Sequence, residues 1–224
     1  MTQAAPAMSE ALSHETLVDR YARMAHEFEP RAVDRLLRAF DVVLAAAGLV
    51  LTSPLMALCA LAVRASGSRS VLYRGDRVGR GGAIFTMVKF RTLKPQAEAR
   101  IGPFYGEELT RLTEGEQTRV GGLLRASKLD ELPQLWNVLR GEMSLVGPRP
   151  FVVHESEQIT GWASRRLETT PGITGLWQIL GRNDIPFEEM VKLDYVYVTN
   201  WSLWWDIKIL VQTLPVVLAR RGAY

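Results

Sequence analysis

The sequence predicts a mostly helical α+β protein with a small β element that associates with a membrane. Residues 42–63 form a run of 22 residues without a charged side chain, long enough to cover the hydrocarbon core of a bilayer as a helix. Residues 71–74 and 84–91 have the composition of two short strands joined by a glycine-rich turn. Helical spacing of apolar residues returns in the second half of the chain. Together these patterns favour a helical domain built beside a membrane segment.

Composition limits the classes of partner. With 224 residues and a formal net charge of +3, the chain has room for one sizeable domain and an appendage. The mild positive charge suits a phosphorylated small molecule or an acidic membrane surface, but it is too weak to indicate nucleic acid, which we do not expect to bind. Cys59 is the single cysteine, so an intrachain disulfide is excluded. With only three histidines, a histidine metal site or a Ser-His-Asp triad is not expected.

The chain divides into three segments. Residues 1–30 are polar and mixed in charge, lack the pattern of a secretory signal, and fit either a short amphipathic helix or a tail. Residues 31–66 contain the apolar run, which we interpret as a membrane hairpin. Residues 67–224 form the remaining domain, which we expect to face the cytoplasm and to end in amphipathic helices at the membrane interface.

Ser53 and Pro54 interrupt the centre of the apolar run. Proline removes a backbone hydrogen bond there, and the serine hydroxyl can bind a carbonyl that is left free. Basic residues flank both ends of the run: Arg31, Arg35 and Arg38 before it, and Arg64 and Arg69 after it. Because positive charge stays on the cytoplasmic side, such flanks are typical of a re-entrant hairpin. A kinked helix that spans the bilayer is the alternative, and the residues alone leave both open.

The two predicted strands lie in a strongly basic stretch. Lys89 and Arg91 are on the second of them, and glycines occupy the turn between the two. The glycine spacing matches neither a P-loop nor a dinucleotide fingerprint. The stretch therefore fits a phosphate cradle or a basic strip against anionic lipid.

Residues 129–139 carry the clearest chemical signal. Leu132, Leu135, Trp136 and Leu139 have the spacing of a helix face that packs on a core, with a proline in the first turn. Asp130 and Glu131 stand just before that face. The pair fits a helix cap that opposes the helix dipole, and it also fits a pair of reactive carboxylates.

Cations close to this pair favour the chemical interpretation. Arg125 and Lys128 precede the two carboxylates, and Arg149 follows in a turn that Pro148 and Pro150 make rigid. Guanidinium groups bind phosphate oxygens in bidentate fashion, so these side chains could converge on a phosphate-sized space.

Three later segments have weaker patterns. Residues 152–166 and 187–198 are predicted to be helical. Asp194, in the second of these, fits an ordinary surface or capping residue better than a functional one. Tryptophans at positions 201, 204 and 205 predict a helix at the level of the lipid headgroups, with packing in the core as an equal alternative.

Several ordered motifs give the chain a family resemblance. They cover residues 73–74, 76–80, 89–92, 129–135, 143–150, 171–178, 181–182 and 221–224. In these motifs, and from about residue 31 onward, the sequence resembles the bacterial sugar transferase family, which consists of monotopic phosphoglycosyl transferases.

The resemblance implies a reaction and a location. Members transfer a sugar 1-phosphate from a UDP-sugar to a polyprenyl phosphate, usually undecaprenyl phosphate, release UMP, and begin the assembly of polysaccharides such as exopolysaccharide. By resemblance, Asp130 is the nucleophile, and Asp130 and Glu131 are the candidate ligands of Mg²⁺. A hairpin broken at a Ser-Pro pair is also a family feature, which favours the re-entrant alternative at Ser53-Pro54. We therefore expect a protein of the bacterial inner membrane, with its catalytic domain on the cytoplasmic side and a homo-oligomer among its candidate states.

The candidate residues for binding the phosphates and the nucleotide-sugar are all basic: Lys89, Arg91, Arg125, Arg149 and Arg182. A metal-dependent glycosyltransferase with an Asp-x-Asp motif is not supported, because that motif does not occur in the chain. The remaining alternative is a non-catalytic, membrane-anchored scaffold of a polysaccharide assembly complex. It predicts no UMP release from UDP-sugars.

Overall fold

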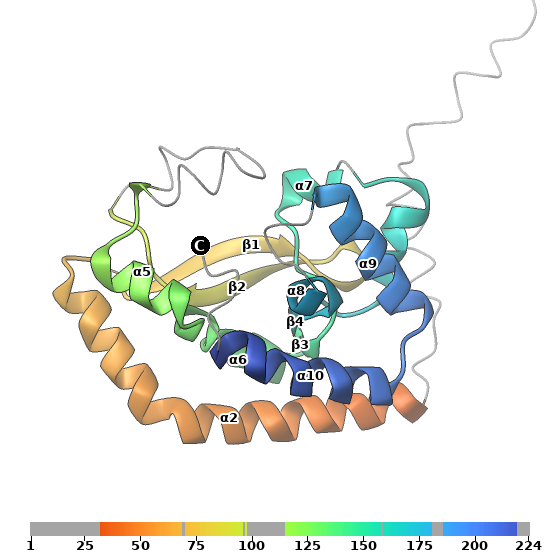
Figure 1. Ribbon diagram of the computed structural model, residues 1–224, viewed down its shortest axis with the longest axis horizontal. Helices are drawn as coiled ribbons and strands as arrows, with labels where there is room; N and C mark the ends of the chain where they lie inside the picture. Colours follow the sequence, from red (N-terminus) through yellow and green to blue (C-terminus); the bar gives the residue numbers. More distant parts are fainter. Residues whose placement is uncertain are drawn as a thin grey trace, which may run out of the picture.

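The computed structural model describes residues 32–68, 70–95, 97, 115–157, 159–180 and 186–218. The predicted segment 1–30 lies outside these residues. The described chain is α+β and mostly helical, as predicted. Helices and two small sheets are arranged above one long helix, which lies along the lower edge of the molecule in Figure 1.

The long helix α2 (Ala32–Ala65) contains the whole apolar run. It is the one helix of the described chain that is long and apolar enough to cross a membrane. Pro54 cannot donate to the carbonyl of Val50, four residues before it, and the Ser53 hydroxyl donates to that carbonyl at 2.8 Å. This is the contact predicted for the serine. Figure 1 shows that the helix bends, so that its last part rises beside α5.

Both parts of α2 pack against the same domain. Ala45 is fully buried in a core cluster with Met87 and Val138, while Cys59 and Val63 are buried against Phe90 and its neighbours. The two clusters therefore involve different parts of α2, one around Ala45 and the other around Cys59 and Val63. The long helix is therefore part of the fold along most of its length.

An antiparallel hairpin covers the centre of α2. Its strands are β1 (Leu72–Val78) and β2 (Ile84–Phe90), joined through a short 3-10 helix η1 (Arg80–Gly82). The predicted glycine turn is confirmed by Gly81, which adopts φ 66°. The first strand is longer than predicted, because Gly75 is accommodated inside it opposite Met87.

The central elements follow in chain order: α5 (Arg119–Ala126), η2 (Leu129–Glu131), α6 (Gln134–Arg140) and β3 (Ser144–Val146). The predicted core face of α6 is wrong in part, because Trp136 is 53% exposed. Asn137 is buried instead. Its Oδ1 accepts from the Val88 amide at 3.0 Å, and its Nδ2 donates to the Thr86 carbonyl at 2.8 Å, so α6 docks on the edge of β2.

The last part of the chain contains the remaining elements: α7 (Val153–Glu157), η3 (Gly161–Glu168), β4 (Gly172–Thr174), α8 (Leu176–Leu180), α9 (Phe187–Thr199) and α10 (Leu203–Leu218). The prediction of one helix over residues 152–166 is wrong, because a break separates α7 from the 3-10 helix η3. The predicted helix at 187–198 is confirmed as α9. Trp201 and Trp205 pack against a core cluster, whereas Trp204 is 62% exposed.

β4 pairs in parallel with β3, and this pairing brings two glycine-containing motifs into contact. A Cβ atom on Gly172 would lie 2.1 Å from the Gly147 nitrogen, and one on Gly175 would lie 2.3 Å from the Gly147 oxygen. Only glycine permits so close an approach of the two backbones. The glycines thereby fix the turn that carries Arg149.

Candidate active site

Asp130 lies in η2, between the end of α5 and the start of α6. The residue before this short helix, Lys128, adopts a left-handed conformation with φ 59°, and it is the only non-glycine residue of the described chain with a positive φ. Such a conformation costs energy in a residue with a side chain and recurs at functional sites. The sharp turn at Lys128 places Asp130 beneath the hairpin strand β2, which contacts η2.

The Asp130 side chain is buried, with 4% of its surface exposed. Its Oδ1 atom is inaccessible to solvent and has no hydrogen-bond partner. Burial, and next the charge of Glu131, raise the pKa of Asp130 to about 6, although Lys89 and Arg125 act in the opposite direction. At neutral pH the carboxylate is therefore largely ionised but poorly solvated, which is a reactive state for a nucleophile.

The alternative in which Asp130 caps α6 is not what the structure shows. Pro133 occupies the N-cap position of α6, and no side chain caps it. Because Asp130 forms part of the preceding 3-10 helix instead, its unpaired oxygen is not explained by a helix-capping role.

A cavity of about 340 Å³ opens next to Asp130. Its lining includes the two residues that flank Asp130, Leu129 and Glu131, together with residues from β1, β2, β4 and α10. The volume lies within the range of small-molecule sites. Four basic residues line the cavity: Arg77, Lys89, Lys128 and Arg149. An anionic ligand is therefore favoured.

The predicted binding residues occupy different positions around this cavity. Lys89 and Arg149 line it. Arg125 is not part of the lining, but its charge lowers the pKa of both Asp130 and Lys89. Arg91 follows β2 and is also absent from the lining. Arg182 lies outside the described residues.

Lys89 has an unusual environment. Burial lowers its pKa to about 8, although Asp130 and Glu131 favour its charged form. Its ammonium nitrogen lies 5.4 Å from the centre of the Tyr73 ring. Lys89 is therefore a partly desolvated cation close to the candidate nucleophile, where its effect on a phosphate is stronger than at the surface.

Arg149 is held in place through its backbone. The Arg166 guanidinium donates to the Arg149 carbonyl and also to Asp194 Oδ2, the latter at 2.7 Å. Both members of this ion pair are buried, with 3% and 1% of their side-chain surfaces exposed. Asp194 is thus a buried partner of Arg166 and not the surface residue that we predicted. The Arg149 side chain itself lies over Trp177, 5.5 Å from the ring centre.

Sequence reasoning did not single out several residues of the cavity: Arg77, Gln134, Trp177, Gln178 and Thr213. Trp177 and Gln178 belong to the motif at residues 171–178, but the spacing of that motif does not reveal that they line the cavity next to Asp130. Thr213 is on α10, where only an amphipathic pattern was visible.

Asp130 and Glu131 are the candidate metal ligands. In the described part of the chain, no group of three or more His, Cys, Asp or Glu residues could hold a metal ion. Mg²⁺ needs fewer protein ligands than such a group supplies, since it commonly binds one or two carboxylates, water and substrate phosphates. The unpaired Oδ1 of Asp130 and the neighbouring Glu131 at the cavity fit that donor set.

Comparison with known proteins identifies the family. The model of a family described as bacterial sugar transferase matches residues 33–220. A UDP-galactose-lipid carrier transferase of Erwinia amylovora is 39% identical over 227 residues, which cover 97% of this chain and 47% of the relative. The exopolysaccharide production protein ExoY of Rhizobium meliloti (strain 1021) is 44% identical over 197 residues, which cover 84% and 87% of the two chains.

A third relative is the UDP-glucose:undecaprenyl-phosphate glucose-1-phosphate transferase of Caulobacter vibrioides, 40% identical over 204 residues that cover 86% of this chain and 73% of the relative. The chain spans about half the length of the Erwinia amylovora relative. The family match includes α2, the buried Asp130 and the cavity beside it. The chain belongs to the bacterial sugar transferase family.

Proposed function

We propose that this protein transfers a sugar 1-phosphate from a UDP-sugar to a polyprenyl phosphate and releases UMP. Family membership and the names of relatives such as the Caulobacter vibrioides transferase support the overall reaction. The observation that carries the mechanism is the buried Asp130, which has an unpaired oxygen and lies next to a cavity lined by basic residues.

The first step forms a covalent intermediate. An Asp130 oxygen attacks the phosphorus that carries the sugar, the bond from that phosphorus to the bridging oxygen breaks, and UMP leaves with that oxygen. The product is an acyl phosphate between Asp130 and the sugar. A covalent step divides one transfer between two large substrates into two displacements, each with a nucleophile already in place.

Cations of the cavity stabilise the charge that develops on the phosphate oxygens. Lys89 approaches from the β2 side, and Arg149 approaches from the turn after β3. Guanidinium groups suit this role, since they donate two parallel hydrogen bonds to a phosphate. Asp130 and Glu131 would hold Mg²⁺, which neutralises the diphosphate when it is bound.

The second step returns the enzyme to its initial state. A phosphate oxygen of the polyprenyl phosphate attacks the phosphorus of the intermediate, and the bond to Asp130 breaks. The product is a polyprenyl diphosphate sugar, and the Asp130 carboxylate is regenerated without a net change in protons.

We also propose a monotopic position in the membrane, on the cytoplasmic side of the bacterial inner membrane. Both ends of α2 contact the same domain: Arg38 donates to the Leu139 carbonyl at 2.7 Å, and Val63 is buried near Phe90. A straight helix of 34 residues would be about 50 Å long and would carry its ends to opposite sides of a bilayer. Contact of both ends with one domain supports the re-entrant arrangement.

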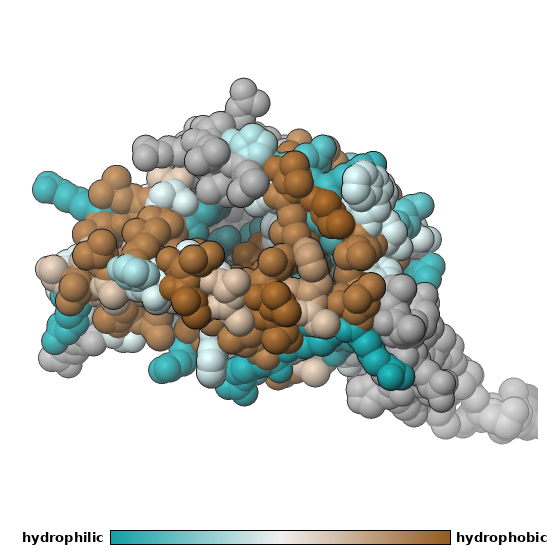
Figure 2. Space-filling model, turned by 90° about the horizontal axis from the view of Figure 1, so that it is seen from below, coloured by the Kyte–Doolittle hydropathy of each residue, from teal (hydrophilic) through white to brown (hydrophobic). Residues whose placement is uncertain are grey.

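An apolar surface supports the same position. Only 11% of the most apolar window of α2 is buried. Seen from below, in Figure 2, hydrophobic side chains gather on the face over α2 and α10. The most exposed of them are Leu36, Val43, Val50, Leu51, Leu58, Leu61, Trp204 and Val211. An apolar surface of this extent is typical of a membrane contact, and Trp204 suits the headgroup level.

UMP release from membranes that contain the protein tests the reaction. We expect a burst of about one UMP per active chain when a suitable UDP-sugar is added without acceptor, and continued turnover with polyprenyl phosphate. UMP release only in the presence of acceptor would exclude the covalent intermediate and favour direct transfer. No release from any UDP-sugar, with or without acceptor, would favour the non-catalytic scaffold.

A further inference from the structure

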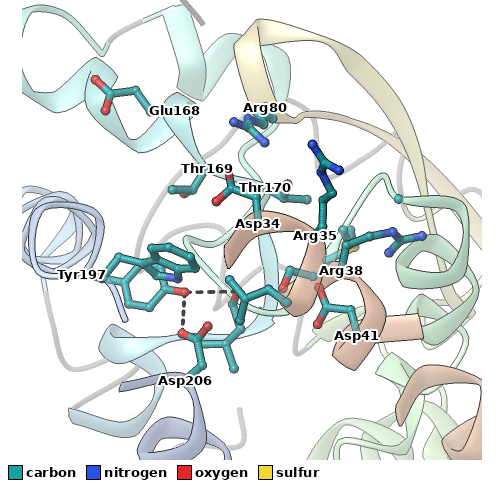
Figure 3. A pocket seen from close by; sticks show the side chains of 16 residues that line it. Asp34, Arg35, Arg38, Asp41, Arg80, Glu168, Thr169, Thr170, Tyr197 and Asp206 are labelled. Atoms are coloured by element: carbon teal, nitrogen blue, oxygen red, sulfur yellow. Dashed lines mark hydrogen bonds between the residues drawn. The ribbon is translucent and has the colours of Figure 1, made fainter. Parts of the chain in front are cut away.

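A second cavity, of about 510 Å³, lies away from Asp130. It is enclosed by the first turns of α2, the end of η3, β3 and the segment where α9 meets α10. Figure 3 shows its polar side chains: Arg35, Arg80 and Glu168 lie toward the upper side of the view, Asp34 lies near Thr170, and Asp41 and Asp206 lie toward the lower side. The proposed reaction uses none of these residues.

Two arginine side chains of this cavity have no partner among the described residues. Arg35 of α2 and Arg80 of η1 both line it, both are exposed, and neither guanidinium forms a hydrogen bond or ion pair with the described residues. Arg38 differs, since its guanidinium donates to the carbonyls of Val138 and Leu139 at the end of α6. Arg35 and Arg80 therefore remain available to an anionic group that enters from their side.

The lower side of the cavity in Figure 3 carries two carboxylates, Asp41 and Asp206, that form no salt bridge within the described part of the chain. Asp206 Oδ1 accepts from the Tyr197 hydroxyl at 2.7 Å, and Asp41 Oδ1 accepts from the Leu145 amide at 3.0 Å. Both aspartates are buried, with 6% and 8% of their surfaces exposed. Burial raises the pKa of Asp206 to about 6. A ligand that brings a positive charge or several hydrogen-bond donors would relieve the cost of these buried carboxylates.

The cavity also borders the apolar surface described above. Leu36 and Val43 are 59% and 65% exposed, and they alternate along α2 with Asp34, Arg35 and Asp41 of the cavity. If the apolar side of α2 enters the membrane, the cavity lies just above it, at the level of the headgroups.

We propose that this second cavity binds the headgroup of a phospholipid that carries a phosphate diester and a primary ammonium group. Arg35 and Arg80 bind the phosphate, and Asp41 and Asp206 accept hydrogen bonds from the ammonium. The acyl chains follow the exposed side of α2 toward Leu36 and Val43. This site is separate from the catalytic cavity, and its test does not depend on UMP release.

Thermal unfolding of the full chain in detergent micelles tests the proposal. Added phosphatidylethanolamine is expected to raise the Tm by about 5–10 °C at a hundredfold excess over its Kd. Phosphatidylcholine, whose quaternary ammonium cannot donate a hydrogen bond, is expected to raise it by less than half as much. Soluble phosphoethanolamine at the same concentration is expected to leave the Tm unchanged.

Variants assign the effect to this cavity. The double variant Arg35→Gln/Arg80→Gln is expected to lose at least half of the Tm rise, whereas Arg74→Gln, which removes an exposed arginine of β1, keeps it. Asp206→Asn preserves an acceptor for Tyr197 but removes the charge, so it is expected to reduce the preference for phosphatidylethanolamine over phosphatidylcholine.

Four results would overturn the proposal. They are equal Tm rises with the two lipids, a larger rise with phosphatidylglycerol, a rise with soluble phosphoethanolamine that matches the lipid, and a full response in the Arg35→Gln/Arg80→Gln variant. The third would identify a soluble phosphate compound as the ligand, and the fourth would place the lipid elsewhere on the protein.

Discussion

Replacement of Asp130 by asparagine removes one charge and almost no volume, and it should have two opposite effects. Burial and Glu131 raise the pKa of Asp130 from 3.8 to about 6, which corresponds to about 3 kcal/mol at 1.36 kcal/mol per pKa unit. Because the folded chain holds this proton more tightly than the unfolded chain does, the ionised carboxylate destabilises the fold above about pH 6, and this cost disappears below pH 3.8.

Asp130→Asn should therefore unfold at a higher temperature than the wild type at pH 7.5, with a gain of up to about 3 kcal/mol. At the same time it should lose UMP release, because the amide cannot act as the nucleophile. The wild-type rate should fall about tenfold per pH unit below about pH 6, as the carboxylate becomes protonated.

Two assays test these effects together: single-turnover UMP release without acceptor, and thermal unfolding of the same preparations. Asp76→Asn, which removes an exposed carboxylate of β1, is the matched control and should change neither measurement by much. An Asp130→Asn variant with wild-type UMP release would refute the nucleophile. A variant that is less stable than the wild type at pH 7.5 would refute the argument from burial.

Three further substitutions test the surroundings of the site. Lys89 lowers the pKa of Asp130, so Lys89→Met should raise the pH at which UMP release is half-lost on the acid side. The same variant should remove any loss of rate above about pH 8, because Lys89 itself becomes neutral there. Arg166→Leu should cost about 3–5 kcal/mol in urea unfolding, because it leaves a buried carboxylate unpaired. Gly172→Ala should cost at least about 2 kcal/mol, because its Cβ would lie 2.1 Å from the Gly147 nitrogen and force β3 and β4 apart.

Each of these three predictions has a result that would contradict it. An unchanged pH profile in Lys89→Met would show that this ammonium does not act on Asp130. Less than about 1 kcal/mol of destabilisation in Arg166→Leu would mean that the carboxylate finds another partner or a proton. Gly122→Ala in α5 is the control for Gly172→Ala, since its Cβ would meet only the flexible end of a glutamine at 3.3 Å. Equal effects of the two alanines would refute the close-approach argument.

Much of the fold follows from local patterns in the sequence. The apolar run, the glycine turn between β1 and β2, and the helix α9 are all determined by residues that are near one another in the chain. The contact of Ser53 with the Val50 carbonyl could also be predicted, because a proline removes one specific hydrogen bond.

Two of the failures involve polar residues that are buried by distant partners. Asn137 replaces Trp136 in the core because its amide pairs with the backbone of β2, a contact across 49 positions that hydrophobic periodicity cannot register. Asp194 was taken for a surface residue because its partner Arg166 lies 28 positions away. The cavity beside Asp130 also depends on distant contacts, because its walls come from segments far apart in the sequence, among them β1, β2, α10 and β4, which pairs in parallel with β3.

The attachment of α2 to the domain makes the proposed membrane element an internal part of the enzyme. Arg38 binds the last carbonyls of α6, Asp41 binds the amide of Leu145, and Ala45 fills the core beneath the hairpin. Removal of this helix would open the core, so a soluble catalytic fragment cannot be made by trimming the chain at residue 66. In the proposed monotopic arrangement, the same contacts would set the height and the tilt of Asp130 above the lipid, which an unrelated transmembrane anchor would not reproduce.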